Sequence, residues 1–217
     1  MQNERRLKKD LFGEVALRPG ESPPVIVRNA GKAHWWVRPL ARYLLRREAA
    51  ALAALDGLDG VPQLIDIKTD ILLRSYLDGA PMQAAKPREV AWFNAAARLL
   101  RQMHCAGVVH NDLAKEPNLL VLNDNRPAII DFQLAAHSNR RGRLFRVAAY
   151  EDIRHLLKHK RTYCAGSLTQ REKDILANPS PVSRVWMATV KPVYLFVTRR
   201  MLGWADREGA GDRGAQP

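Results

Sequence analysis

Residues 108–133 read VVHNDLAKEPNLLVLNDNRPAIIDFQ, and this stretch decides the fold that we expect. Its apolar runs at 119–122 and 128–130 predict a hairpin of two short buried strands. Asn118 precedes the first run and Asp131 follows the second, so a hairpin brings the two side chains together. Amide and carboxylate oxygens at one point suit a hard cation such as Mg²⁺. Asp112 is then free to orient a hydroxyl group and accept its proton.

The rest of the chain alternates predicted strands and helices. Apolar runs predict strands over 12–17, 25–27, 63–67 and 71–76. Helical spacing of apolar residues predicts helices over 39–55, 88–106, 150–158 and much of 169–201. The breaker sequence Asp78-Gly79-Ala80-Pro81 predicts a hinge between two lobes.

Glu48 lies on the apolar side of the predicted helix 39–55, because it follows Leu45 by three residues and precedes Leu52 by four. A buried carboxylate requires a cationic partner or a set of hydrogen bonds. We therefore expect a basic side chain beside Glu48. The alternative is that Glu48 lies at the edge of the apolar stripe and reaches water.

The segments around Asp112 and Asp131 resemble the catalytic and metal loops of the protein-kinase-like superfamily, which read His-Arg-Asp followed by Asn, and Asp-Phe-Gly. The matching residues here are His110-Asn111-Asp112, Asn118 and Asp131-Phe132-Gln133. The resemblance implies that Asp112 is the catalytic base and that Asn118 and Asp131 hold the Mg²⁺ of bound ATP. It makes Lys115 a cation that faces the phosphates, although the loop has one residue more than usual before Asn118. Gln133 stands where the family usually has glycine.

The same resemblance assigns nucleotide-binding groups in the first third of the chain. Glu48 becomes the helix glutamate that pairs with the phosphate-binding lysine. Lys32 is the lysine best placed by count, but it follows a turn-like segment, whereas Arg28 ends a predicted strand; both stay candidates. Ser75 to Leu77 takes the position whose backbone meets adenine. No Gly-x-Gly-x-x-Gly loop is present.

The resemblance covers roughly residues 11–160. It implies an α+β, two-lobed protein-kinase-like fold, with a compact β-rich N-lobe over 1–75, a mainly helical C-lobe over 76–207 and a disordered tail over 208–217. The subfamilies it resembles most are the small bacterial lipopolysaccharide (Kdo and heptose) kinases and the RIO-type kinases, on the phrases Arg47-Glu48-Ala49, Gly60-Val61-Pro62 and Tyr76-Leu77-Asp78-Gly79.

Asp152 follows Asp131 after twenty intervening residues. It resembles the buried aspartate that braces the catalytic loop, or it is a helix N-cap or first-turn acid. A eukaryotic-type protein kinase uses a longer segment here for peptide docking, ending in Ala-Pro-Glu, and none is seen. The short connection therefore favours a non-peptide substrate.

Positive charge is concentrated in the second half of the chain. The net charge is +13, and residues 138–201 hold fourteen Lys and Arg against four Asp and Glu. Such a field attracts RNA, anionic lipid or a phosphorylated substrate, unless it is only a solvated face. With no signal peptide, and with basic residues interrupting the apolar stretch 185–202, we expect a cytoplasmic protein with optional peripheral contact at the inner membrane surface.

Several smaller features bear on ligands. Cys105 and Cys164 lack metal-ligand spacing and are interpreted as reduced thiols. His155 and His159 have a zinc-like i, i+4 spacing but no third ligand, so we expect no metal other than Mg²⁺. The tryptophans are interpreted either as packing residues or as anchors at a lipid interface; they include Trp35, Trp36, Trp186 and Trp204.

The sequence thus predicts an ATP-dependent phosphotransferase acting on a hydroxyl group of a non-peptide acceptor, either a glycolipid or another anionic small molecule. One alternative is a degenerate kinase fold that binds nucleotide or a partner without catalysis, which the missing glycine loop favours. The other is a RIO-like serine/threonine protein kinase or RNA-associated kinase, which the positive charge favours.

Overall fold

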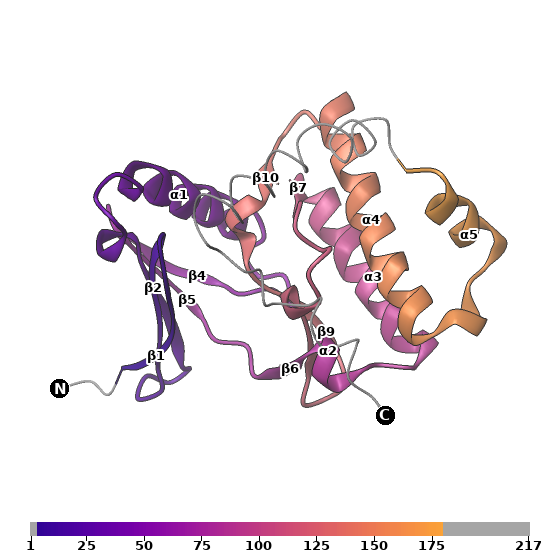
Figure 1. The fold of residues 1–217 in the computed structure, drawn as a ribbon, viewed down its shortest axis with the longest axis horizontal. Coiled ribbons are helices and arrows are strands. Elements are labelled where there is room, and N and C mark those ends of the chain that lie inside the picture. Colours follow the sequence, from indigo (N-terminus) through magenta and orange to yellow (C-terminus); the bar gives the residue numbers. More distant parts are fainter. Residues whose placement is uncertain (1–3, 180–217) are drawn as a thin grey trace, which may run out of the picture.

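The computed structural model describes residues 4–179, which form an α+β fold with a β-rich part and a helical part (Figure 1). The predicted fold class is confirmed. The later portion of the predicted helical segment 169–201, the predicted tail, Trp186 and Trp204 lie outside the described residues.

A five-stranded antiparallel sheet forms the β-rich part. Its strands, in spatial order, are β1 (Arg5–Asp10), β2 (Gly13–Arg18), β3 (Val25–Asn29), β5 (Ile71–Ser75) and β4 (Leu64–Ile67). The sequence does not predict β1, because this strand is charged and almost wholly exposed. Its place in the sheet comes from backbone pairing with β2. A single unpredicted strand therefore precedes the first strand that the sequence predicts, and the two form a hairpin.

Helix α1 (Arg38–Ala54) carries one apolar face that serves two hydrophobic cores. Pro39 occupies the first turn, where its missing N–H costs no helical hydrogen bond. Leu45 packs with Leu72 of the sheet, whereas Leu52 packs into the core of the helical part. Because each buried leucine contributes about 1.5–3 kcal/mol, α1 holds both parts of the molecule.

The helical part is built around α3 (Val90–Cys105) and α4 (Arg143–Tyr163), with α5 (Gln170–Ala177) packed on α4 (Figure 1). The sequence predicts α3 well, but α4 is longer at both ends than the predicted helix 150–158. The shorter elements are β6 (Gly79–Pro81), α2 (Met82–Ala85), β7 (Val108–Val109), η2 (Glu116–Asn118), β8 (Leu119–Leu122), β9 (Pro127–Ile129), η3 (Phe132–Leu134), β10 (Ala136–His137) and η4 (Ala165–Ser167).

Most of the segment Asp78–Pro81, for which the sequence predicts a hinge, forms a strand. Gly79–Pro81 is strand β6, which pairs with β8 in a three-stranded sheet of the helical part. A Cβ atom on Gly79 would lie 2.8 Å from the Val121 carbonyl oxygen, so only glycine fits this approach. The connection between the two parts is therefore the shorter segment Tyr76–Asp78.

Candidate functional site

The predicted hairpin forms and sets the frame of the site. Strands β8 and β9 are antiparallel, with Leu119 opposite Ile129. The Ile130 amide donates to the Asn118 carbonyl oxygen at 2.9 Å, which extends the pairing by one step. Asn118, before β8, and Asp131, after β9, therefore lie at the same end of the hairpin, as the sequence predicts.

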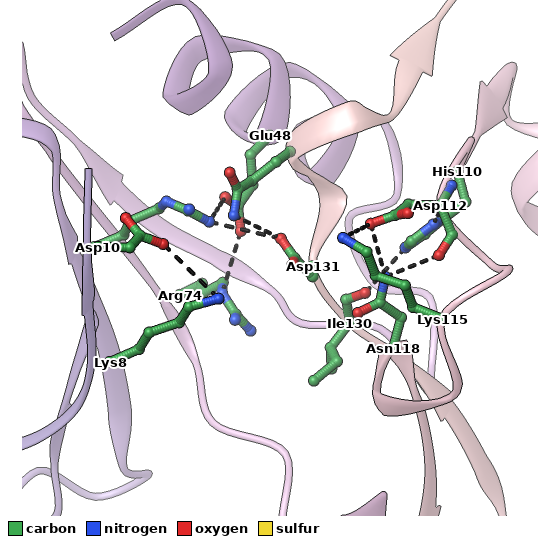
Figure 2. Close-up of polar contacts among 12 residues, drawn as sticks. Lys8, Asp10, Glu48, Arg74, His110, Asp112, Lys115, Asn118, Ile130 and Asp131 are labelled. Atoms are coloured by element: carbon green, nitrogen blue, oxygen red, sulfur yellow. Dashed lines mark hydrogen bonds and ion pairs between the residues drawn. The ribbon is translucent and has the colours of Figure 1, made fainter. Parts of the chain in front are cut away.

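Asp112 is held by two polar side chains of its own loop (Figure 2). The Asn118 side-chain amide donates to Asp112 Oδ2 at 3.2 Å and to the Asp112 carbonyl oxygen at 2.9 Å. Lys115 Nζ lies 3.0 Å from the same carboxylate oxygen. The described loop thus orients one carboxylate with an amide and an ammonium group. Lys115 contacts the predicted base; its predicted contact with phosphate stays a prediction.

His110 is a buried structural residue at the start of this loop. Its Nδ1 accepts from the Asp112 amide at 3.2 Å, so its Nε2 carries the proton and donates to the Ile130 carbonyl oxygen at 2.9 Å. Its ring packs edge-on against Phe132 with 5.0 Å between centroids. The histidine therefore joins the loop of Asp112 to the segment that ends at Asp131.

Asp152 braces the same loop from helix α4. Its buried carboxylate accepts from the amides of His110 at 2.7 Å and Asn111 at 2.9 Å. Asn111 has φ 64°, in the left-handed region that asparagine adopts more readily than most residues. The alternative interpretation as a helix N-cap or first-turn acid is wrong, because α4 begins nine residues earlier, at Arg143.

Asp131, directly before η3, is held in its ionised form. Its backbone is left-handed, with φ 66°, and Gln133 Nε2 donates to its Oδ1 at 2.9 Å. Burial raises the pKa of Asp131, but the positive charges of Arg28 and Arg74, with smaller effects from His110 and Gln133, lower that pKa below its ordinary value. Gln133, which stands where the resembled kinases usually have glycine, thus positions the carboxylate of Asp131.

Glu48 has the cationic partners that its position predicts, and there are two of them (Figure 2). Its side chain is 0% exposed. Arg28 Nη1 lies 3.0 Å from one carboxylate oxygen, and Arg74 Nε lies 3.3 Å from the other. Arg28 also reaches to 3.7 Å from Asp131 Oδ1. The edge-of-stripe alternative for Glu48 is therefore wrong.

The two candidate phosphate-binding cations lie in different surroundings. Arg28, on β3, faces Glu48 and Asp131, whereas Lys32 lies beyond the strand and pairs with Glu14 at 2.9 Å. Of the two, only Arg28 is joined to the residues of the candidate site by these contacts. Its contact with phosphate stays a prediction.

Arg74 is a site residue that the sequence analysis misses. It lies on β5, and the pairing of β3 with β5 sets Arg74 opposite Ile26, two residues before Arg28. Both arginines thereby reach the same buried glutamate. A basic residue within an apolar strand, Ile71-Leu72-Leu73-Arg74, is the signal that could have pointed to it.

At the predicted adenine position, part of the backbone is already engaged. The Ser75 amide donates to Gln63 and the Tyr76 amide donates to Pro24, at 2.9 and 3.0 Å. Ser75 Oγ also accepts from the Gln63 amide at 2.8 Å. Of the three backbone amides in this segment, the Leu77 amide is therefore the one left to donate a hydrogen bond to adenine. This role of Leu77 stays a prediction.

The hairpin β1–β2 has a short connection between its strands. Two residues, Leu11 and Phe12, connect its strands, and the Phe12 amide donates to Asp10 at 2.8 Å. Gly13 has φ 127°, and a Cβ there would lie 2.2 Å from the Asn29 carbonyl oxygen. This glycine serves the close approach of β2 to the end of β3.

The residues present fit a hard cation between the loops. Asn118 and Asp131 supply an amide and an ionised carboxylate, and Mg²⁺ usually takes one or two carboxylates together with substrate phosphates. Within residues 4–179, no group of three or more His, Cys, Asp or Glu residues is gathered for a metal ion. His159 of the zinc-like pair directs Nε2 to the Leu113 carbonyl oxygen at 2.7 Å.

Comparisons with known proteins show the family of this chain. A family model described as RIO domain matches residues 27–170. A protein named "Probable SapB synthase", from Streptomyces coelicolor, is 31% identical over 123 residues, which cover 46% of this chain and 13% of that protein. The chain therefore corresponds to a small part of this relative. In the described part of the chain, no helix is both long and apolar enough to cross a bilayer.

Proposed function

We propose a specific phosphotransferase function from the premise that this chain belongs to the RIO domain family, a family of kinase-like proteins. The proposed reaction is transfer of the γ-phosphate of ATP to a hydroxyl group of a non-peptide, anionic acceptor. The observation that carries the proposal is the arrangement around Asp112: its carboxylate is oriented by Asn118 and Lys115, next to the segment that holds Asp131 ionised.

In this mechanism Asp112 accepts the proton of the acceptor hydroxyl while the hydroxyl oxygen attacks the γ-phosphorus. The bond from that phosphorus to the oxygen bridging to the β-phosphate breaks, and ADP leaves with the bonding electron pair. Asn118 and Asp131 would hold Mg²⁺, which when bound neutralises charge on the phosphates. Arg28 and Arg74 supply further positive charge beside Asp131.

Two observations support an anionic, non-peptide acceptor. Between η3 and α4 the chain holds only the short strand β10 and residues 138–142, which is little room for docking a peptide. Within this stretch and the first turn of α4, four arginines lie exposed without an intervening acid; they are Arg140, Arg141, Arg143 and Arg146. An exposed cationic segment close in sequence to Asp131 attracts phosphorylated or otherwise anionic acceptors.

The test is transfer of label from γ-labelled ATP to membrane, protein, RNA and small-molecule fractions of a host lacking this protein. We expect label in a lipid or small-molecule product, and a loss of about 10²–10⁴-fold for Asp112→Asn because the general base is removed. Asp70→Asn is the control, since Asp70 pairs with Arg42 away from this loop. Label in the RNA or protein fraction alone would contradict the proposed acceptor; equal labelling by wild type and Asp112→Asn would contradict the mechanism.

Nucleotide binding without catalysis is a second candidate, favoured by the two-residue β1–β2 connection and by Arg28 engaged with Glu48 and Asp131. Thermal-shift titration with ATP separates the two candidates. A shift that requires Mg²⁺ and is lost in Asp131→Asn supports the catalytic site. A Mg²⁺-independent shift without label transfer supports the binding protein.

A further inference from the structure

One surface of the β-rich part exposes large apolar side chains that the site does not use. Trp35 is 80% exposed and Trp36 is 55% exposed in the turn that leads into α1. Leu40 and Tyr43, on α1 itself, are 50% and 56% exposed. The interpretation of Trp35 and Trp36 as packing residues is therefore wrong. We call this set the α1 face.

The residues of the α1 face are spaced so that they lie on one side of the helix and its lead-in. Leu40 follows Trp36 by four positions, and Tyr43 follows Leu40 by three, so they lie along one side of the helix and its lead-in. The buried stripe of α1 is separate and includes Ala41, Leu45 and Glu48. The helix and its lead-in thus carry a second group of apolar side chains, half or more of each of which the described part of the chain leaves exposed.

The charges carried by the α1 face segment itself are basic, although Lys32 pairs with Glu14 and Arg42 pairs with Asp70. Residues 32–47 contain five Lys and Arg and no Asp or Glu. Arg46 is exposed, and Arg47 lies over the Tyr43 ring at 5.8 Å from its centroid. Exposed tryptophans with arginines beside them are typical of protein surfaces that lie in the interface of an anionic bilayer.

The α1 face also lies beside the candidate site. Arg47 donates to the carbonyl oxygens of Leu134 at 3.0 Å and Ala135 at 2.9 Å, directly after the segment of Asp131. Leu134 is itself exposed, and its carbonyl oxygen also accepts from the Asn111 side chain at 3.0 Å. Arg47 therefore links the α1 face to the two loops of the site.

We propose that the α1 face docks this protein onto an anionic lipid bilayer, with Trp35, Trp36, Leu40 and Tyr43 entering the headgroup region and the flanking arginines meeting the lipid charge. Single-stranded RNA could stack on the aromatic rings, but the aliphatic Leu40 on the same face favours lipid. This membrane binding does not depend on the proposed phosphotransferase activity. Only its consequence, that a lipid-borne acceptor is presented beside Asp112, rests on the proposed phosphotransfer.

The experiment is sedimentation of the full chain with vesicles, without nucleotide, so that binding is read independently of turnover. Vesicles of equimolar phosphatidylglycerol and phosphatidylcholine should bind the protein, in a salt-sensitive way, and pure phosphatidylcholine should not. Trp35→Ser/Trp36→Ser should reduce binding by about tenfold or more, since both side chains enter the interface. The side chains are exposed, so the thermal midpoint should stay unchanged.

The comparison variant is Leu144→Ser. Leu144 is 81% exposed among the arginines at the start of α4, which makes it the competing apolar and basic position. Binding should persist in Leu144→Ser. Equal loss in both variants, retained binding in the double tryptophan variant, or binding of wild type to single-stranded RNA but not to vesicles would each overturn the proposal. So would a dimer in sedimentation velocity that the tryptophan substitutions dissociate.

Discussion

At the scale of single residues, Glu48 is a fully buried carboxylate that requires compensating positive charge. It is shared by two arginines whose side chains are themselves 13% and 12% exposed. Removing a buried charge from such a group leaves its partners without compensation, which costs more than the original arrangement contributes. The glutamate thus ties strand β3, strand β5 and helix α1 to one another at the point nearest Asp131.

Glu48→Gln should lower the free energy of unfolding by about 3–5 kcal/mol, because Arg28 and Arg74 then lose their shared buried counter-charge. The glutamine keeps the size of the side chain, so the loss reports charge and not a cavity. Urea unfolding followed by circular dichroism measures it.

Glu14→Gln is the matched control, since Glu14 pairs with Lys32, whose side chain is half exposed. Little change in unfolding is expected there, because solvent screens such a pair. If the two substitutions destabilised the protein equally, the buried charges around Glu48 would contribute no more to stability than the exposed Glu14–Lys32 pair.

The residues of the site differ in how far the sequence reveals them. Asp112, Asn118 and Asp131 lie in one contiguous stretch with recognisable strands around them, so their approach can be predicted from hairpin geometry. Arg74 cannot be predicted in this way, because its meeting with Glu48 depends on the register between β3 and β5. Register is decided by all the pairings of a sheet together and leaves no local signal in a single strand.

At the scale of elements, helices α1 and α3 are predicted to within two residues because their apolar spacing is regular. Strand β1 escapes prediction because its side chains are charged and exposed, and only its backbone pairing makes it a strand. The first turns of α4 escape for a related reason: Arg143–Tyr150 buries little, and the helix is fixed further on by Asp152, Leu156 and Leu157.

Helix α5 is docked by a buried lysine. Lys160 of α4 is buried, and its Nζ lies 2.7 and 2.9 Å from the two carboxylate oxygens of Glu172. Glu172 also closes a capping box with Thr169 at the start of α5. Burial raises the pKa of Glu172, but the hydrogen bonds from Lys160 and Thr169 lower it below its ordinary value of 4.5.

The stability that Glu172 contributes should therefore depend on pH. Its pKa is lower in the folded protein than in the unfolded chain, so the contribution is full above about pH 4.5 and is lost as the pH falls through the folded value. At neutral pH, Glu172→Gln should cost about 1.5–3 kcal/mol, as expected for hydrogen bonds to a charged group. Urea unfolding across this pH range measures the difference between wild type and variant.

That difference should shrink toward zero on acidification. Gln170→Ala serves as the control, because Gln170 is exposed on the same helix and its side chain donates to Asp174 and not to the Lys160–Glu172 pair. A wild-type to Glu172→Gln difference that stayed constant down to low pH would show that packing of α5, and not the ion pair, holds this helix.

At the scale of the whole molecule, Arg47 joins the β-rich part to the segment that follows Asp131. Its guanidinium donates to the Ala135 carbonyl oxygen through Nε at 3.1 Å and through Nη2 at 2.9 Å, and to Leu134 through Nη2 at 3.0 Å. Helix α1 already carries apolar side chains into both cores. Arg47 adds a polar contact between the two parts where the candidate site lies.

Arg47→Gln should loosen the segment 132–137 without unfolding the molecule, because the shorter side chain removes charged hydrogen bonds while α1 keeps both of its apolar contacts. Hydrogen exchange of the amides in that segment should quicken by about tenfold or more. The amide of Ile130, which is bonded within the neighbouring hairpin, should keep its protection. Arg46→Gln, on the exposed side of the same helix, should change neither. If both substitutions left the segment equally protected, η3 and β10 would be held by Phe132 and Ala135 in the core, and the two parts of the protein would be coupled through α1 packing alone.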